Sequence, residues 1–133
     1  MKKYNWLILI IIYCTLIFLF THSPVSAGEN TLYIWDTLFS FTPTQNRIIN
    51  LMTRKMTHMI TFGILAYLFY RLFNKKKYVL AWFFATLYGG FDEWHQSFID
   101  GRMGTIIDVC LNSFSAFCVI FSLYLRNNRK ISE

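Results

Sequence analysis

The chain has 133 residues, enough for one domain, and 55% of them are hydrophobic and 20% aromatic. A soluble fold of this length cannot bury that much apolar surface, which excludes an ordinary soluble domain. The formal net charge of +6 does not indicate a nucleic-acid partner, because the basic residues are confined to the flanks of long apolar runs.

The first apolar run, residues 6–20, follows Lys2 and Lys3 and predicts a transmembrane helix over about residues 5–21. A second interpretation is a signal peptide, because residues 25–27 read Val-Ser-Ala, which is typical of a cleavage site. We favour the retained helix. Cleavage leaves the rest of the predicted topology unchanged.

Residues 22–41 are predicted to form an outer loop whose aromatic side chains lie on the membrane surface, where Trp and Tyr prefer the headgroup level. Thr42, Pro43 and Gln45 then have the pattern of a capping box, which predicts a helix from residue 43 to about residue 73. Such a helix is about 45 Å long. Because the hydrocarbon core is only about 30 Å thick, the span itself is predicted over about 54–73.

Two further spans are predicted over about residues 78–96 and 105–125, joined by a short outer turn that contains Gly101 and Gly104. Basic residues precede the first span, separate the second from the third and follow the fourth, while all acidic residues except Glu133 lie in or beside the other segments. The positive-inside rule therefore predicts cytoplasmic termini. The expected fold is one all-α domain over residues 1–133, a bundle of four transmembrane helices.

Polar residues gather near the predicted outer end of three of these spans. At 1.5 Å per helical residue they lie about 21 to 28 Å from the cytoplasmic ends, in one thin layer. Within each helix they share a face at a spacing of three or four residues. The groups are Lys55 with His58, Asp92 with His95 and Gln96, and Asp108 with Asn112.

Glu93 points about 100° away from Asp92 on its helix and is predicted to face a different neighbour or the lipid headgroups. A charged group at the middle of the bilayer costs roughly 2.5 to 3.5 kcal/mol. The polar groups are therefore expected to face one another or a wet cavity. Such a cleft, which would also include Arg102, suits proton transfer by a His–Asp pair, with a basic residue holding an anion.

Two alternatives stay open for this layer. Two histidines with two or three carboxylates equally suit a divalent ion, although no metal-binding spacing such as His-Glu-x-x-His is present. In the purely structural alternative, the basic side chains pair with Asp92 and Asp108 to fix the helix register. The cysteines lie inside apolar runs without a Cys-x-x-Cys spacing, so neither disulfides nor a zinc knuckle is indicated, and no cofactor is predicted.

The order of these residues resembles the VanZ-like family of small bacterial membrane proteins. The matching motifs are Lys55-x-x-His58, then Asp92-Glu93-x-His95-Gln96-x-Phe98 with Gly101-Arg102, and finally Asp108 with Asn112. Three positions depart from the family's usual pattern: Thr61, Asp100 and Ser115. Thr61 argues against an acid role at position 61, and Ser115 bears on how tightly the fourth helix packs.

The resemblance implies a four-helix membrane fold and, for the family's namesake, lowered susceptibility to the glycopeptide antibiotic teicoplanin. We therefore expect a multi-pass plasma-membrane protein of the cell envelope that binds or acts on an anionic ligand at the outer leaflet, such as a lipid-linked cell-wall precursor or a lipoglycopeptide. The alternative is a non-catalytic scaffold whose polar layer is structural. Whether the chain is an enzyme stays open.

Roles within the expected site follow from side-chain chemistry. His58, Asp92, His95 and Asp108 are the candidates for proton transfer and its orientation. The candidates for ligand binding are Lys55, Glu93, Gln96, Arg102 and Asn112, with Arg54 as a further cation.

Overall fold

The computed structural model describes residues 2–132 apart from 24–25, 40, 100–101 and 103. Within these residues every regular element is a helix, which confirms the predicted all-α class. The helices are α1 (Lys3–His22), α2 (Gly28–Leu38), α3 (Pro43–Leu72), α4 (Lys77–Gln96) and α5 (Ile106–Ser132). Asp100 and Gly101, which entered the sequence analysis, lie outside the described residues.

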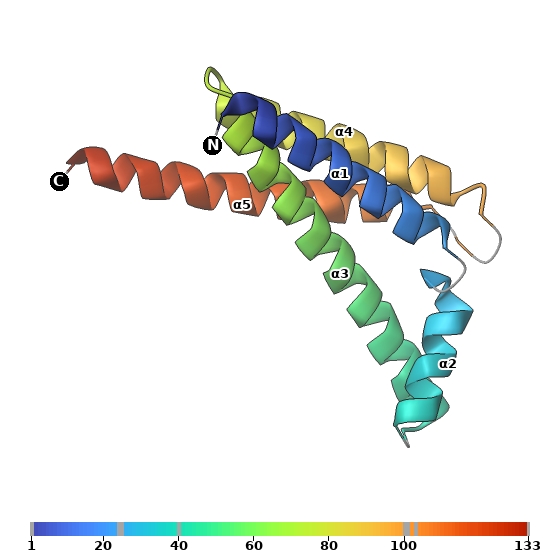
Figure 1. The fold of residues 1–133 in the computed structure, drawn as a ribbon. Coiled ribbons are helices and arrows are strands. Elements are labelled where there is room, and N and C mark those ends of the chain that lie inside the picture. The colour runs from blue at the N-terminus through green and yellow to red at the C-terminus, as the bar shows by residue number, and fades with distance from the viewer. Residues whose placement is uncertain (1, 24–25, 40, 100–101, 103, 133) are drawn as a thin grey trace.

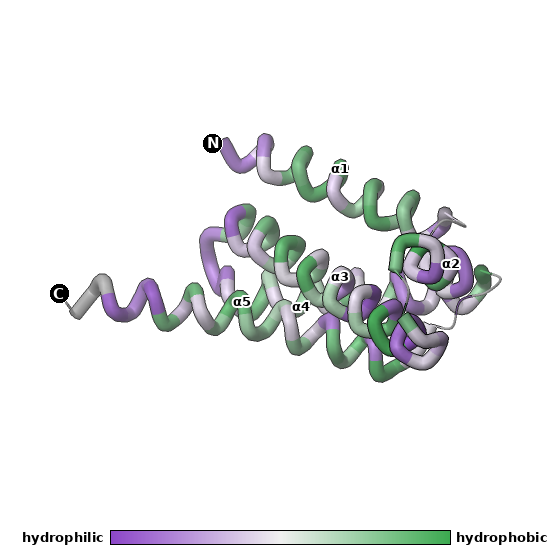
Figure 2. Tube along the Cα trace, turned by 90° about the horizontal axis from the view of Figure 1, so that it is seen from below, coloured by the Kyte–Doolittle hydropathy of each residue, from purple (hydrophilic) through white to green (hydrophobic). Residues whose placement is uncertain are grey.

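Helices α3, α4 and α5 all contact one another and form the centre of the fold, while α1 packs on α3 and α4. Helix α2 contacts no described helix other than α3. It forms a hairpin with the first part of α3, and this hairpin stands away from the bundle (Figure 1). Both ends of the described chain lie at the same end of the bundle as the α3–α4 turn (Figure 1). The hydrophilic ends of α1 and α5 and the hydrophilic α3–α4 turn are therefore on one side (Figure 2).

Small residues let the central helices approach closely. Ala81 and Ala85 of α4 and Ala116 of α5 are almost completely buried. A Cβ added to Gly89 would lie 3.4 Å from the Phe62 ring, so Gly89 permits the close approach predicted for it. The Ser115 hydroxyl donates to the Met59 carbonyl of α3, and α5 is packed tightly at this position.

Helix α3 begins as predicted. Thr42 is its N-cap, Pro43 stands in the first turn, and the side chains of Thr42 and Gln45 form the reciprocal capping box. The prediction of a loop over residues 22–41 was wrong for its central part, because α2 occupies that segment. Contacts with α3 stabilise this short helix: Asn46 donates to the Asp36 carboxylate, and Asn50 donates to the Gly28 carbonyl at 2.9 Å.

Two of the described helices, α1 and α5, are long and apolar enough to cross a membrane, and only 17% of each apolar window is buried. The sequence predicted four such spans. Helices α3 and α4 fall short by this measure, since the polar residues of the predicted layer interrupt their apolar runs. Exposed large hydrophobic side chains nevertheless occur on every described helix, far beyond what a soluble monomer of this size leaves uncovered. This surface is consistent with a membrane protein.

Candidate functional site

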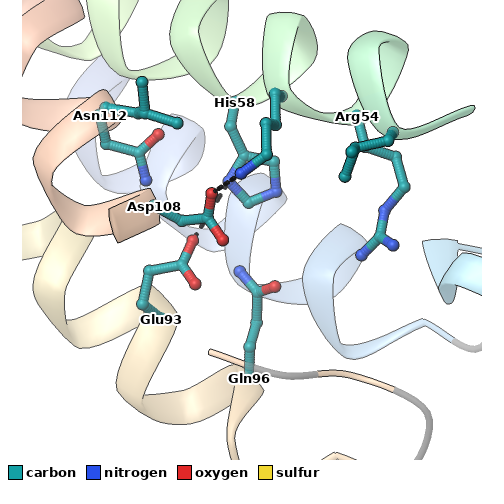
Figure 3. Close-up of a pocket in the computed structure, with 9 residues that line it drawn as sticks. Arg54, His58, Glu93, Gln96, Asp108 and Asn112 are labelled. Atoms are coloured by element: carbon teal, nitrogen blue, oxygen red, sulfur yellow. Dashed lines mark hydrogen bonds and ion pairs between the residues drawn. The ribbon is translucent and has the colours of Figure 1, made fainter. Parts of the chain in front are cut away.

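The middle of α3, the C-terminal end of α4 and the N-terminal end of α5 surround a cavity of about 280 Å³ (Figure 3). Six of the nine predicted site residues line it. The lining residues are Leu51, Arg54, Lys55, His58, Glu93, Gln96, Asp108, Leu111 and Asn112. Of the residues that helical rise placed in one layer, Lys55, His58, Asp108 and Asn112 line this cavity, whereas Asp92 and His95 do not.

On one wall of the cavity, Lys55 of α3 forms an ion pair with Asp108 of α5. The second carboxylate oxygen of Asp108 accepts a hydrogen bond from the Thr105 hydroxyl at 2.8 Å. Thr105 also caps α5, because its hydroxyl accepts from the Asp108 backbone N–H at 3.1 Å. Both oxygens of Asp108 are thus engaged, and the charge of Lys55 is balanced.

Glu93 of α4 lies near this pair, and its side chain is 5% exposed. Its Oε2 accepts from the Thr105 backbone N–H at 3.3 Å. Its Oε1 lies 3.5 Å from Nδ1 of His58 and accepts no hydrogen bond. Gly104 makes this arrangement possible: a Cβ at that position would stand 1.8 Å from the Glu93 carbonyl oxygen, so only glycine lets the chain pass this close to the end of α4.

Asn112 of α5 is 1% exposed and points into the space between the helices (Figure 3). Neither atom of its side-chain amide has a hydrogen-bond partner. Leaving a buried polar group unpaired costs about 1 to 3 kcal/mol. The cavity thus presents unused hydrogen-bonding capacity from both Asn112 and Glu93.

Asp92, the neighbour of Glu93, faces α1 instead. Its two oxygens accept hydrogen bonds from the Thr21 hydroxyl at 2.9 Å and from the Gln96 amide at 2.7 Å. Asp92 and His58 also line a second cavity of about 180 Å³ between α1 and α3. Asp92 therefore belongs to the contact that holds α1 on the bundle, with His58 between the two cavities.

Arg102 extends this network without lining the first cavity. It donates to the Gln96 side-chain oxygen at 2.9 Å and to the Ser26 carbonyl at 2.7 Å. Burial lowers the pKa of the Arg102 guanidinium from its ordinary value. Among the described residues no carboxylate hydrogen-bonds to it, so Arg102 ties the α1–α2 and α4–α5 connections to the end of α4 through neutral groups.

His95, predicted to share the cleft, lies elsewhere. Its ring centroid is 4.4 Å from that of Phe18 and 5.6 Å from that of His22, both on α1. It lines neither of the two cavities described above. The i, i+3 spacing that joins it to Asp92 places it on the α1 side of α4, whereas Glu93 faces α3 and α5.

A comparison with known protein families places this geometry in context. The family model described as VanZ/LLP1 matches residues 6–127. The chain belongs to the VanZ/LLP1 family. No curated protein and no solved structure matches it. The VanZ/LLP1 match extends from α1 into α5 and includes every residue that lines the cavity, in agreement with the resemblance seen in the sequence.

Several residues of this VanZ/LLP1 site were not singled out by sequence reasoning. Thr105 precedes Asp108 by three residues, the spacing of a helix N-cap, and this signal was available. Thr21 and Ser26 gave no signal, because hydroxyls near the end of an apolar helix are common. Arg54 was named only as an additional cation, yet it lines the cavity and makes no hydrogen bond or ion pair with any other described residue.

One set of side chains has the composition of a metal site. His58, Asp92 and Glu93 each offer a ligand atom, and these atoms all lie within 4.8 Å of one another. They come from two neighbouring helices, and their sequence spacing matches no known metal motif.

Proposed function

We propose that this VanZ/LLP1 protein is a multi-pass protein of the bacterial plasma membrane that binds an anionic amphiphile at the outer leaflet. In this proposal α1, the second half of α3, α4 and the apolar part of α5 are the four spans, and α1 is retained. Tyr13 and Thr21 support retention, because they connect α1 to Thr61 of α3 and to Asp92 of α4. The basic ends face the cytoplasm, as the positive-inside rule favours.

The unpaired Arg54 at the cavity is the observation that carries the ligand assignment. A guanidinium binds carboxylate and phosphate groups through two parallel hydrogen bonds, which makes Arg54 a natural anchor for an anionic head. Leu51 and Leu111 line the same cavity and offer apolar contact. Because the helices around it expose hydrophobic side chains, an amphiphile fits better than a freely soluble anion. A lipid-linked cell-wall precursor and a lipoglycopeptide both have this chemistry.

The site residues have graded roles in this proposal. Lys55, Glu93, Gln96 and Asn112 shape the binding cavity, and Arg102 holds Gln96 in place. For proton transfer the geometry offers His58 with Glu93, at 3.5 Å, while Asp108 orients Lys55. Asp92 and His95 support this set from the α1 side. The proposal assigns binding and leaves the reaction unassigned.

The family's namesake gives the proposal a phenotype, lowered susceptibility to teicoplanin. Expression in a susceptible bacterium is expected to raise the inhibitory concentration of teicoplanin. Arg54→Gln should abolish this effect and weaken binding of a lipid-linked precursor to the purified protein about tenfold, since a charge-assisted hydrogen bond contributes about 1.5 kcal/mol or more. Arg47→Gln is the matched control, because Arg47 is exposed on the same helix and outside the cavity. Equal inhibitory concentrations for both variants at equal protein abundance would sink the proposal.

A non-catalytic scaffold is the second candidate, and the bonded network around Asp92 favours it. Thr21, Gln96, Arg102 and Ser26 link α1 to the rest of the fold. Under this alternative, Lys55→Asp and Asp108→Lys each lower the amount of folded protein, activity falls in proportion, and the double swap restores both. Under the binding proposal, the double swap restores folded protein but not teicoplanin resistance.

A further inference from the structure

Two consecutive carboxylates of α4 are buried, and among the described residues no lysine or arginine forms an ion pair with either of them. Asp92 is 2% exposed and Glu93 4% exposed. Among the described residues Lys55 pairs with Asp108, and Arg102 hydrogen-bonds to Gln96 and Ser26. Arg54 lines the same cavity as Glu93 but forms no ion pair with it. A buried carboxylate left without a cation is costly, and the penalty is several kcal/mol per ion before compensation. A cation bound between these two carboxylates would stabilise both of them.

The geometry of the cluster fits a single ion. His58, Asp92 and Glu93 present one nitrogen and two oxygens that all lie within 4.8 Å of one another. Metal–ligand bonds of about 2.0 to 2.2 Å hold the ligand atoms of one ion no more than about 4.4 Å apart. A small inward shift of flexible side chains therefore brings these atoms to bonding distance. The hydrogen bonds that Asp92 accepts do not prevent this, because each carboxylate oxygen has a second lone pair.

An independent observation points to a ligand at the same place. Asn112 is 1% exposed, lines the cavity together with His58 and Glu93, and has no partner for either amide atom. Glu93, whose Oε1 also has no hydrogen-bond partner, lines the same cavity (Figure 3). A bound ion with its waters would satisfy these groups, since amide and carboxylate oxygens accept from metal-bound water and can themselves coordinate.

We infer that His58, Asp92 and Glu93 form a binding site for a divalent transition-metal ion, Zn²⁺ or Mn²⁺, with Asn112 facing its open side. Imidazole favours zinc-like ions and carboxylate favours manganese-like ions, so this mixed donor set fits both. Three protein ligands beside a cavity leave a coordination position open, as in metal sites that act on a ligand. Thr21 and Gln96 hydrogen-bond to Asp92 and orient it from behind, which is typical of the outer shell of a metal site.

The inference goes beyond the proposed function, because metal uptake is measured with the metal alone and requires no amphiphile. The full chain, purified in detergent, is titrated with ZnCl₂ and separately with MnCl₂, and bound metal is counted by mass spectrometry. We expect one ion per chain for one of the two metals. Its affinity should fall at least about 100-fold in Glu93→Gln and in His58→Gln, since losing even an outer-shell partner costs up to this factor.

His95→Gln is the control. It removes an imidazole of α4, the helix that carries Glu93, and this imidazole lies against Phe18 of α1. The variant should bind metal as the wild type does. A wild type that binds neither metal overturns the inference. So does a Glu93→Gln variant that binds as tightly as the wild type, because the metal would then be bound elsewhere on the surface.

Unfolding of the wild-type protein gives a test that needs no variant: the bound metal should raise the unfolding temperature, and EDTA should reverse the rise. Teicoplanin binding measured with and without EDTA separates failure of the metal site from failure of the proposed function.

Discussion

Asp92 and Glu93 are neighbours in the sequence and equally buried, yet they face different parts of the molecule. Both oxygens of Asp92 accept hydrogen bonds, one from α1 and one from Gln96. Glu93 has one oxygen bonded to the Thr105 backbone and one without a hydrogen bond, beside a cavity. Successive residues of a helix point about 100° apart. One turn of α4 thus combines a carboxylate that holds the fold together with a carboxylate that is available to a ligand.

The largest effect on stability is expected from Asp92→Ala. Removing the carboxylate leaves the Thr21 hydroxyl and the Gln96 amide without their acceptor, and hydrogen bonds to charged groups contribute about 1.5 to 3 kcal/mol each. We expect the free energy of unfolding in detergent to fall by about 3 kcal/mol. Asp92→Asn keeps the shape and one acceptor and should lose about half as much. Equal stability of Asp92→Ala and the wild type would contradict the structural role of Asp92.

Gly104→Ala should have the next largest effect. A Cβ there collides with the Glu93 carbonyl oxygen at 1.8 Å, and overpacking of this kind costs typically about 1 to 3 kcal/mol. The α4–α5 connection must shift, which moves the Thr105 N–H away from Glu93. The same unfolding measurement and metal titration should both respond. Phe98→Ala, in the same connection but exposed, is the control and should change neither.

Glu93→Gln should be nearly neutral for folding. The exchange keeps the volume and the oxygen that accepts from Thr105, and the other oxygen has no hydrogen bond to lose. We expect the free energy of unfolding to change by less than about 1 kcal/mol. A loss as large as that of Asp92→Ala would erase the distinction between the two faces.

Asn112→Leu should have the smallest effect on stability, or a slightly favourable one. It replaces a buried amide without partners by an apolar side chain of similar size, and removing unpaired polar groups in this way is nearly neutral or stabilising. Binding should nevertheless weaken, because the polar lining of the cavity is lost. Unfolding and ligand titration of the same preparation measure both quantities. Destabilisation by more than about 2 kcal/mol would mean that Asn112 has a partner in the folded protein.

Much of this arrangement could be predicted because rise along a helix is constant. Distances of 1.5 Å per residue placed Lys55, His58, Asp108 and Asn112 at one level, and all four line the same cavity. The capping box at Thr42 correctly predicted the first residue of α3. Such properties depend on one helix at a time, which is why they can be read from the sequence.

Properties that depend on how helices rotate against one another could not be predicted in the same way. The placement of His95 against Phe18, and of Glu93 toward α3 and α5, follows from the rotation of α4 about its own axis. Helix α2 depends on Asn46 and Asn50 of α3, residues whose partners lie more than a helical turn away. The bonds of the Thr21 hydroxyl to Asp92 and of the Ser26 hydroxyl to Arg102 join segments far apart in the chain, so they form only after α1 has docked.

Helix α3 connects two parts of the molecule without a break, since its regular structure runs from Pro43 to Leu72 and contains no proline after its first turn. Its first turns carry the contacts to α2, and the middle of the same helix carries Arg54, Lys55 and His58. Arg54 itself packs over Gly28 at the start of α2. The side chains that line the cavity and those that hold α2 therefore belong to one continuous helix, and Arg54 lies between the two regions, in contact with the start of α2 and at the edge of the cavity.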